Sequence, residues 1–238
     1  LGNTIAEIAQ EKAGIIKENT PIICGDNRFE IQNIIQYKAK ELSAPFIDAT
    51  LIPVDYQTDL KGNYQQKNIK VAVAIFDELK KLSVEIPNAA IKNGLLHVHQ
   101  NTGFIGRWFQ FSDNPLTICD TAHNKAGLDL VFGQLNAMPM KKHVVLGFVN
   151  DKKIDEILLE LPTNSVFYFV KPSINRGRDP KEYENELQNA KIPYQIFSSV
   201  QQGYEAALQQ IKKNEMIFIG GSNFVVGDFL EKNLEITQ

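Results

Sequence analysis

Short apolar runs alternate with helix-forming segments through the second half of this chain, and this alternation limits the folds that the chain can adopt. Strand-like runs are predicted at residues 116–119, 143–148, 165–170, 194–197 and 216–219, and helices near 125–137, 151–161, 180–190, 199–212 and 224–232. Strands that alternate with helices in this way form a mainly parallel sheet covered by helices. We therefore expect an α/β fold, in which residues 108–111 add an edge strand ahead of the sheet.

The stretch from Leu116 to Asn124 contains the first passage from a strand to a helix. Asp120 ends the strand, and Asn124 can cap the helix that begins at Lys125. Ligands of open α/β sheets bind at such corners, outside the carboxyl ends of the strands. Asp120 is therefore a candidate for binding a ribose hydroxyl or orienting a cation, and His123 for donating a hydrogen bond to an anionic group or relaying a proton for it. The alternative is a helix-capping turn with a surface histidine.

Glycines and polar residues also follow the other predicted strands. Gly147 ends the second strand, Lys171 follows the third, and residues 220–222 (Gly-Gly-Ser) follow the last. If the strands are parallel, all of these residues lie at the same edge of the sheet as Asp120. Glycines that lead into a helix can present backbone N–H groups to an anion. The sequence therefore predicts a binding crevice at this edge.

The first part of the chain has a less regular pattern. Helices are predicted at 4–17, 28–42, 65–82 and from 89 towards 99, strands at 20–25 and 45–49, and an irregular segment at 52–63. Residues 100–106 contain two glycines and no clear period, which is typical of a domain boundary. We therefore expect two domains, 1–105 and 106–238. Because Leu1 is not an initiator, we expect the chain to be the C-terminal part of a longer protein.

Charge and composition exclude some classes of function. A formal net charge of −3 and a pI near 5.9 argue against a nucleic-acid surface. No apolar run approaches the roughly 20 residues that a membrane helix needs. Cys24 and Cys119 each lie in an apolar run, where a free thiol behaves as a small hydrophobic group. We therefore expect a cytoplasmic protein without a membrane partner.

Lys12 occupies an apolar position in the first predicted helix. Its spacing from Ile5, Ile8 and Ala9 predicts that it shares their face. Burial there would favour a neutral, nucleophilic amine. The alternative is a lysine at a helix end whose ammonium group reaches the solvent.

Arg107 lies at the predicted domain boundary, between Gly106 and Trp108. A guanidinium at this position could make a bidentate contact with phosphate or carboxylate. The alternative is a solvated surface arginine.

Residues 173–180 (Ser-Ile-Asn-Arg-Gly-Arg-Asp-Pro) form a basic segment that is rich in turn residues. The segment follows the third strand of the predicted sheet, so it lies near the binding crevice. It can serve as a substrate lid or simply connect two elements with solvated arginines.

Several segments together resemble folylpolyglutamate synthase, a family that is often bifunctional as dihydrofolate synthase and belongs to the Mur ligase superfamily. The segments, in chain order, are 1–5 (LGNTI), 11–15 (EKAGI), 106–107 (GR), 120–124 (DTAHN), 145–147 (VLG) with 151–152 (DK), and 220–222 (GGS). The resemblance runs through essentially the whole chain. The chain departs from the family at two positions: it has Thr121 where the family usually has glycine, and Lys153 where the family usually has aspartate.

The resemblance implies that the chain contains the end of one domain and all of a second. Residues 1–105 would be the end of a P-loop-type ATPase domain, and residues 106–238 a Rossmann-like C-terminal domain that binds glutamate. The phosphate loop and other magnesium ligands of the family are absent from the sequence, so we expect these 238 residues to be inactive alone. An incomplete first domain would expose strand edges and apolar surface, which favours association or partial disorder.

The implied reaction is the ATP-dependent addition of L-glutamate to folate, or to dihydropteroate, through an acyl phosphate. By resemblance, Lys12 forms a carbamate that binds Mg²⁺, Arg107 and Asp120 hold the phosphates and ribose of ATP, and His123 and Ser222 lie near glutamate and the transferred phosphate. The intact enzyme is expected to be monomeric. A ligase for a peptidoglycan precursor and a nucleotide-binding domain without catalysis are the alternatives.

Overall fold

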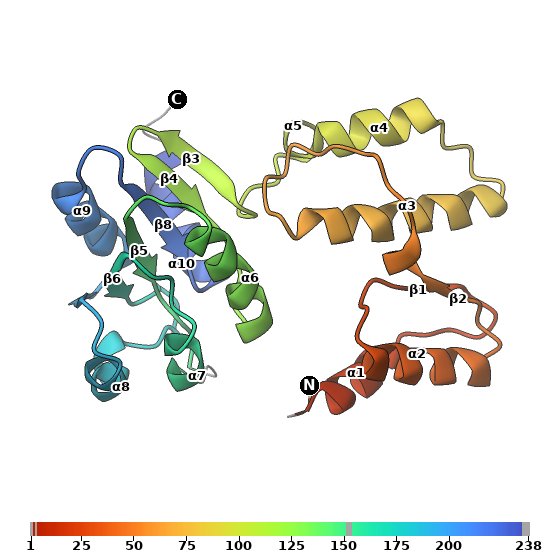
Figure 1. Cartoon of the computed structure of the whole chain (residues 1–238), viewed down its shortest axis with the longest axis horizontal. Coiled ribbons are helices and arrows are strands. Elements are labelled where there is room, and N and C mark those ends of the chain that lie inside the picture. Colours follow the sequence, from red (N-terminus) through yellow and green to blue (C-terminus); the bar gives the residue numbers. More distant parts are fainter. Residues whose placement is uncertain (1, 3, 151–153, 235–238) are drawn as a thin grey trace. The chain divides into compact units, whose positions relative to one another are not determined.

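The chain forms two compact units in a computed structural model, which describes residues 2, 4–150 and 154–234 (Figure 1). Unit 1 comprises Leu1–Asp59 and Asn63–Gly103, and unit 2 comprises Leu60–Gly62 and Phe104–Gln238. Residues 60–62 belong with unit 2 because both the side chain and the backbone of Lys61 hydrogen-bond to it. Its ammonium donates to Gln110 Oε1 at 3.1 Å, and its carbonyl oxygen accepts from Gln134 Nε2 at 3.3 Å.

Unit 1 is built from helices around a two-stranded parallel sheet. Its elements are α1 (Ile5–Ala13), β1 (Ile22–Cys24), α2 (Phe29–Glu41), β2 (Phe46–Asp48), the 3₁₀ helix η1 (Ala49–Leu51), α3 (Gln65–Lys81), α4 (Asn88–Leu96) and α5 (Val98–Thr102). The predicted helices and both predicted strands of this part are confirmed. A second short helix, α5, follows α4 where the sequence pattern becomes irregular.

Helix α1 shows a correction to the sequence prediction. Thr4 begins it with a capping box that includes Glu7, as a Thr-x-x-Glu sequence favours. Its buried residues are Ala9 and Ala13, and the helix packs on α2. Lys12 is exposed, so the prediction that it lies on the buried face is wrong. The buried side of α1 is centred on Ala9 and Ala13, whereas Ile5 and Lys12, which were predicted to share the face of Ala9, are exposed.

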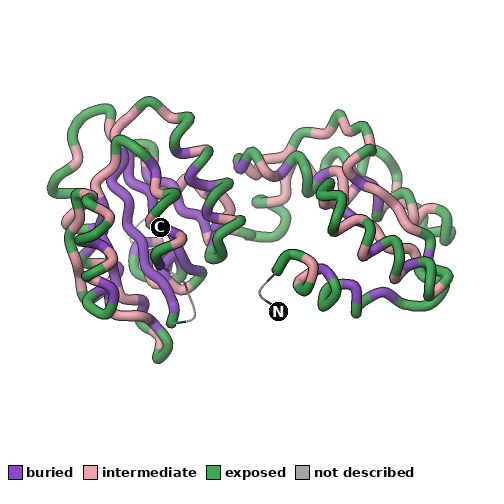
Figure 2. Tube along the Cα trace, turned by 60° about the horizontal axis from the view of Figure 1, so that its bottom comes forward, coloured by how far each residue is buried: buried purple, intermediate pink, exposed green. Residues whose placement is uncertain are grey.

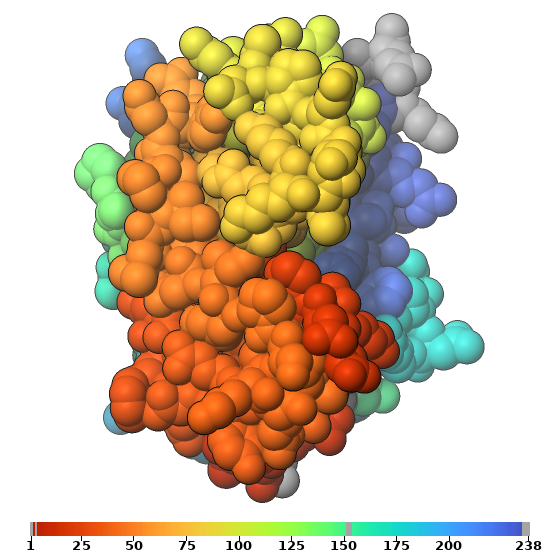
Figure 3. All heavy atoms as spheres, turned by 90° about the vertical axis from the view of Figure 1, so that its right-hand side faces the viewer, coloured from red at the N-terminus to blue at the C-terminus, as the bar shows by residue number. Residues whose placement is uncertain are grey.

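Large apolar side chains remain exposed on unit 1. Among the described residues of this unit, those with the largest exposure are listed here: Ile5, Ile15, Phe29, Tyr37, Leu51, Ile75, Leu82 and Val84. Figure 3 shows one face of unit 1, with the yellow segment of α4 above the orange and red segments. The two-stranded sheet offers the helices little surface to pack against. Much of the apolar surface of the described helices and loops of this unit is therefore exposed. The prediction that this part associates stays a prediction.

Unit 2 contains a six-stranded sheet with the order β3-β4-β8-β5-β6-β7. Its strands are β3 (Phe109–Asp113), β4 (Leu116–Cys119), β5 (Lys142–Leu146), β6 (Ser165–Val170), β7 (Tyr194–Phe197) and β8 (Met216–Gly220). The strands from β4 to β7 pair in parallel, whereas β3 pairs antiparallel to β4 at the edge. The predicted α/β fold, its mainly parallel sheet and its edge strand are therefore confirmed.

Helices cover both faces of this sheet. Its helices are α6 (Lys125–Asn136), α7 (Ile154–Leu158), η2 (Pro180–Tyr183), α8 (Glu184–Asn189), α9 (Val200–Gln210) and α10 (Asn223–Leu234). Helices α9 and α10 contact each other on one face, and α7 contacts both α6 and α8. The central strands β4, β8, β5 and β6 are mostly buried, whereas the edge strands β3 and β7 are only partly buried (Figure 2). Such two-sided burial explains why these strands are continuous apolar runs in the sequence. Residues 151–153 of the predicted helix 151–161 lie outside the described residues.

A buried polar network lies on the face of the sheet that α9 covers. His143 is 1% exposed, and its Nδ1 and Nε2 lie 2.8 Å from Tyr168 Oη and 2.8 Å from Glu215 Oε2. Tyr168 Oη donates to Gln210 at 3.2 Å. The hydrogen bond from His143, supported by the backbone N–H of Lys212, lowers the pKa of the Glu215 carboxyl below its ordinary value. The network therefore fastens the end of α9 and the start of β8 to the middle of the sheet.

Glu215→Gln is expected to lower the free energy of unfolding by about 1–3 kcal/mol at pH 7, because the hydrogen bond from His143 then ends on a neutral amide oxygen instead of a carboxylate. A lowered folded-state pKa stabilises the protein above the unfolded pKa of about 4.3, and this stabilisation is lost as pH falls through the folded value. Urea unfolding from pH 7 to about pH 3.5 should therefore show the difference between the variant and the parent shrinking. The exposed Glu205→Gln is the control. A difference independent of pH would contradict this account.

Candidate functional site

The carboxyl ends of the parallel strands of unit 2 meet at one edge of the sheet. Asp120 N donates to the carbonyl oxygen of Ile219 at 3.0 Å, and Gly147 N donates to that of Gly220 at 3.4 Å. Gly221 has a φ of +88°, and a Cβ there would lie 2.9 Å from the Gly147 carbonyl oxygen. The glycines thus let three strand ends approach closely. The predicted common edge is confirmed.

Gly106 anchors the turn that leads into β3. Its carbonyl oxygen accepts from Thr121 N at 2.8 Å and from Thr121 Oγ1 at 2.9 Å. Its φ is +96°, and a Cβ at this position would lie 2.8 Å from Thr121 Cγ2. Only glycine fits this position without strain. The turn is therefore held directly against the segment that follows β4.

Asp120 fastens the other side of the same turn. Its side chain is fully buried, its Oδ2 accepts from Trp108 N at 2.8 Å, and its Oδ1 accepts from Ala122 N at 2.8 Å. Trp108 is itself buried and has a φ of +49°. Asp120 therefore positions the residues around it through both carboxylate oxygens. Sequence reasoning missed these two backbone donors, because Trp108 is twelve residues away and carries no signal of the contact.

Arg107 lies between these two anchored residues, and its own side chain has no partner among the described residues. It is half-buried, and neither a hydrogen bond nor an ion pair engages its guanidinium. Its backbone is fixed by Gly106 on one side and by Trp108 on the other. A guanidinium that is fixed at its base and free at its tip can bind an anion without first breaking another contact.

His123 follows directly and is exposed to solvent. Its Nδ1 lies 3.1 Å from the carbonyl oxygen of Thr121, which can only accept a hydrogen bond. Nδ1 therefore carries a proton, which leaves Nε2 of the neutral ring as an acceptor. Asn124 caps α6 by accepting from Gly127 N at 2.8 Å. The stretch therefore contains the helix-capping turn with a surface histidine that was given as the alternative. It also has an imidazole nitrogen that can act on a ligand.

Ser222 precedes α10 at the same edge. It is 3% exposed, and its Oγ accepts from Phe224 N at 3.1 Å. Its hydroxyl proton remains available for a ligand at the start of the helix, where the helix dipole favours an anion.

Arg176 joins this edge from the basic segment 173–180. Its guanidinium carbon lies 5.2 Å from the centroid of the Phe224 ring, a cation–π distance. Gly177 forms a bridge with Val149, and the carbonyl oxygen of Arg176 accepts from Asn150 N at 3.1 Å. The segment is therefore fastened beside the end of β5. The position of this basic segment after the third predicted strand indicated that it lies near the crevice. The sequence did not indicate the contact between Arg176 and the Phe224 ring.

Lys12 belongs to unit 1, whereas the other predicted site residues, Arg107, Asp120, His123 and Ser222, belong to unit 2. Lys12 is exposed near the end of α1. Among the residues that the structure describes, no group of three or more His, Cys, Asp or Glu side chains could hold a metal ion. None of the described helices has the length and hydropathy of a membrane span.

Comparison with known families identifies the class of unit 2. Residues 106–223 match the Mur ligase, glutamate ligase domain. Unit 2 therefore contains a Mur ligase, glutamate ligase domain, as the sequence resemblance predicts.

The particular relatives are folate ligases. The chain is 26% identical over 269 residues to the dihydrofolate synthase/folylpolyglutamate synthase of Bacillus subtilis, covering 98% of this chain and 59% of the relative. It is 26% identical to the Escherichia coli protein of the same name over 97% of this chain and 56% of the relative. It thus spans less than two thirds of the length of these relatives.

Solved structures share the fold. The E. coli FolC in complex with DHPP and ADP superimposes with a TM-score of 0.80 at 23% identity, over 100% of this chain and 59% of the other. The Mycobacterium tuberculosis folylpolyglutamate synthase complexed with ADP and AMPPCP gives 0.82 at 20% identity, over 98% and 60%.

Asp120→Asn is expected to destabilise unit 2 by about 2–3 kcal/mol, because an amide oxygen replaces only one of two acceptors for buried N–H groups. Trp108 is the only tryptophan, so its emission should move to longer wavelength as the turn loosens. Urea unfolding and fluorescence check both effects. Asp129→Asn, which breaks an exposed pair with Lys125, is the matched control. An unchanged stability and emission spectrum would overturn the positioning role.

Proposed function

We propose that this chain forms part of an ATP-dependent ligase that adds L-glutamate to folate, and in a bifunctional enzyme also to dihydropteroate, through an acyl phosphate. The observation that carries the proposal is the anchored turn with its unengaged Arg107, at the carboxyl edge of a Mur ligase glutamate ligase domain. The names of the relatives, dihydrofolate synthase/folylpolyglutamate synthase, support the substrate class.

The proposed roles follow from what each side chain offers. Arg107 supplies a free guanidinium for the phosphates of ATP. Asp120 is proposed for the ribose on the resemblance alone, because its buried carboxylate already binds two backbone N–H groups and fixes the turn that carries Arg107. His123 offers Nε2 as a proton acceptor near the incoming amine, and Ser222 offers a hydroxyl near glutamate and the transferred phosphate.

Magnesium is proposed to bind through Lys12 as a carbamate. The described residues contain no carboxylate cluster that could hold the ion, so the contribution of this chain would be one oxygen ligand formed when the Lys12 amine takes up carbon dioxide. The exposure of Lys12 leaves its amine accessible to carbon dioxide, but it removes the burial that was expected to favour the neutral amine, so the carbamate role rests on the resemblance. Bound magnesium would neutralise phosphate charge during transfer.

The domain assignment is also a proposal. Residues 1–105 are assigned to the end of a P-loop-type ATPase domain and residues 106–238 to the glutamate ligase domain. The sequence contains no Gly-x-x-x-x-Gly-Lys-Ser/Thr phosphate loop, so these 238 residues alone are expected to be inactive. Both cysteines are free and buried, which agrees with the reducing environment of the cytoplasm. A monomeric state of the intact enzyme is part of the same proposal.

The test is glutamate-dependent ADP release by the gene-encoded protein that contains this chain, with a reduced folate and with dihydropteroate. Lys12→Ala and Arg107→Ala are each expected to lower turnover by on the order of a hundredfold, because the first removes a proposed magnesium ligand and the second a cationic contact to the ATP phosphates. Lys17→Ala, an exposed lysine beyond the end of α1, is the control. Incubation with ¹³C-bicarbonate should give a carbamate resonance that is missing in Lys12→Ala.

Three outcomes would contradict the proposal. If glutamate and both pterins leave ADP release unchanged while a peptidoglycan precursor increases it, the substrate class is wrong. Saturable ATP binding without turnover and without a need for magnesium would indicate a binding domain. A missing carbamate resonance in the parent protein would remove the role of Lys12.

A further inference from the structure

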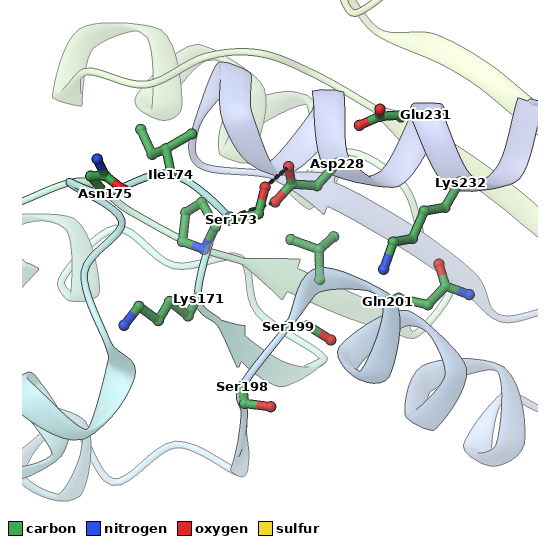
Figure 4. A pocket seen from close by; sticks show the side chains of 12 residues that line it. Lys171, Ser173, Ile174, Asn175, Ser198, Ser199, Gln201, Asp228, Glu231 and Lys232 are labelled. Carbon is green, nitrogen blue, oxygen red and sulfur yellow. Dashed lines mark hydrogen bonds between the residues drawn. The ribbon is translucent and has the colours of Figure 1, made fainter.

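A pocket of about 520 Å³ lies at the carboxyl ends of β6 and β7 (Figure 4). Three segments of unit 2 line it: residues 171–175 after β6, residues 198–201 at the start of α9, and residues 228–232 of α10. Strands β8 and β5 lie between β4, whose end carries Asp120, and the strands that end at this pocket. None of the residues proposed above for ATP or magnesium lines it.

Side-chain hydrogen bonds hold the walls of the pocket together. The carboxylate of Asp228 accepts from Ser173 N at 2.8 Å and from Ser173 Oγ at 2.6 Å, which fastens the segment after β6 to α10. Asn233 Nδ2 donates to Gln201 Oε1 at 3.0 Å, which fastens α10 to α9. The pocket is therefore formed by contacts of the fold, and both oxygens of the Asp228 carboxylate are already engaged.

The remaining polar groups include donors on two sides. The backbone N–H groups of Val200 and Gln201 belong to the first turn of α9, where no helical acceptor exists. Lys232 extends from α10 towards this turn, and Lys171 lies on the other side of the pocket (Figure 4). Among the residues that the structure describes, the Lys171 ammonium pairs with Asp179 alone, at 4.0 Å. Two cations and a helix start thus offer a favourable place for carboxylates.

The rest of the lining defines the class of ligand. Asn175 and Glu231 also line the pocket and supply acceptors, so the pocket suits a chain with both N–H donors and carboxylates better than a bare anion. The described residues that line it include no aromatic ring on which a pterin or nucleobase could stack, and no arginine for bidentate binding of phosphate.

We propose that this pocket binds the γ-linked glutamyl tail of a polyglutamylated folate. The proposal rests on the proposed function, since a ligase that extends such a tail must hold it while a further glutamate is added. The carboxylates of the tail pair with Lys171 and Lys232 and with the first turn of α9, and its amide N–H groups face the acceptors of Asn175 and Glu231.

The test is a titration of the 238-residue chain with γ-linked triglutamate, followed by calorimetry and by amide NMR. Saturable binding is expected, with shifts at Val200 and Gln201. The double variant Lys171→Gln/Lys232→Gln should weaken binding by about tenfold or more, because two charge contacts are lost. Lys213→Gln, an exposed lysine outside the pocket, should bind like the parent. Thermal unfolding of each variant establishes that it is folded.

Three results would overturn the proposal: no saturable binding, binding that the double variant leaves unchanged, or equally tight binding of α-linked triglutamate or inorganic phosphate, which indicates a general anion site. This readout needs neither ATP nor turnover. If the titration fails, the ADP-release experiment still decides the ligase function. If the ADP-release experiment fails, the titration still decides whether the pocket binds the tail.

Discussion

The carboxylate of Asp120 holds the backbone of the proposed nucleotide site in place. A fully buried charge is costly unless hydrogen bonds compensate it, and two backbone N–H groups at 2.8 Å do so here. One of these donors, Trp108 N, belongs to a residue with a positive φ, a conformation that surrounding contacts must maintain. The same interaction therefore stabilises the turn and determines where the Arg107 backbone lies.

The position of this carboxylate depends in turn on the parallel sheet. Parallel pairing of β4, β8 and β5 brings three strand ends to one edge, and glycines at two of these ends allow contact distances that a side chain would prevent. Backbone groups beyond the last paired residues can then face a ligand instead of another strand. Both the Arg107 turn and the pocket of Lys171 and Lys232 use this edge, at different strands.

The sequence predicted the sheet of unit 2 because the signal is local: each strand is an apolar run, and each helix has its own period. Contacts between distant segments left no such signal. The bond from Trp108 N to Asp120 and the ring contact of Arg176 with Phe224 depend on how separate elements pack. Lys12 shows a third limit, because α1 contains two overlapping apolar stripes and only the packing of α2 selects between them.

Thr121 illustrates how a departure from a family pattern can preserve its geometry. The resembled family usually has glycine at this position, yet the Thr121 hydroxyl adds a hydrogen bond to the same Gly106 oxygen that the Thr121 N–H already binds. Its methyl group occupies the space that a side chain at position 106 would need. The threonine therefore strengthens the turn while making glycine obligatory at position 106. The departure constrains the same turn from its other side, so it does not weaken the assignment of Arg107.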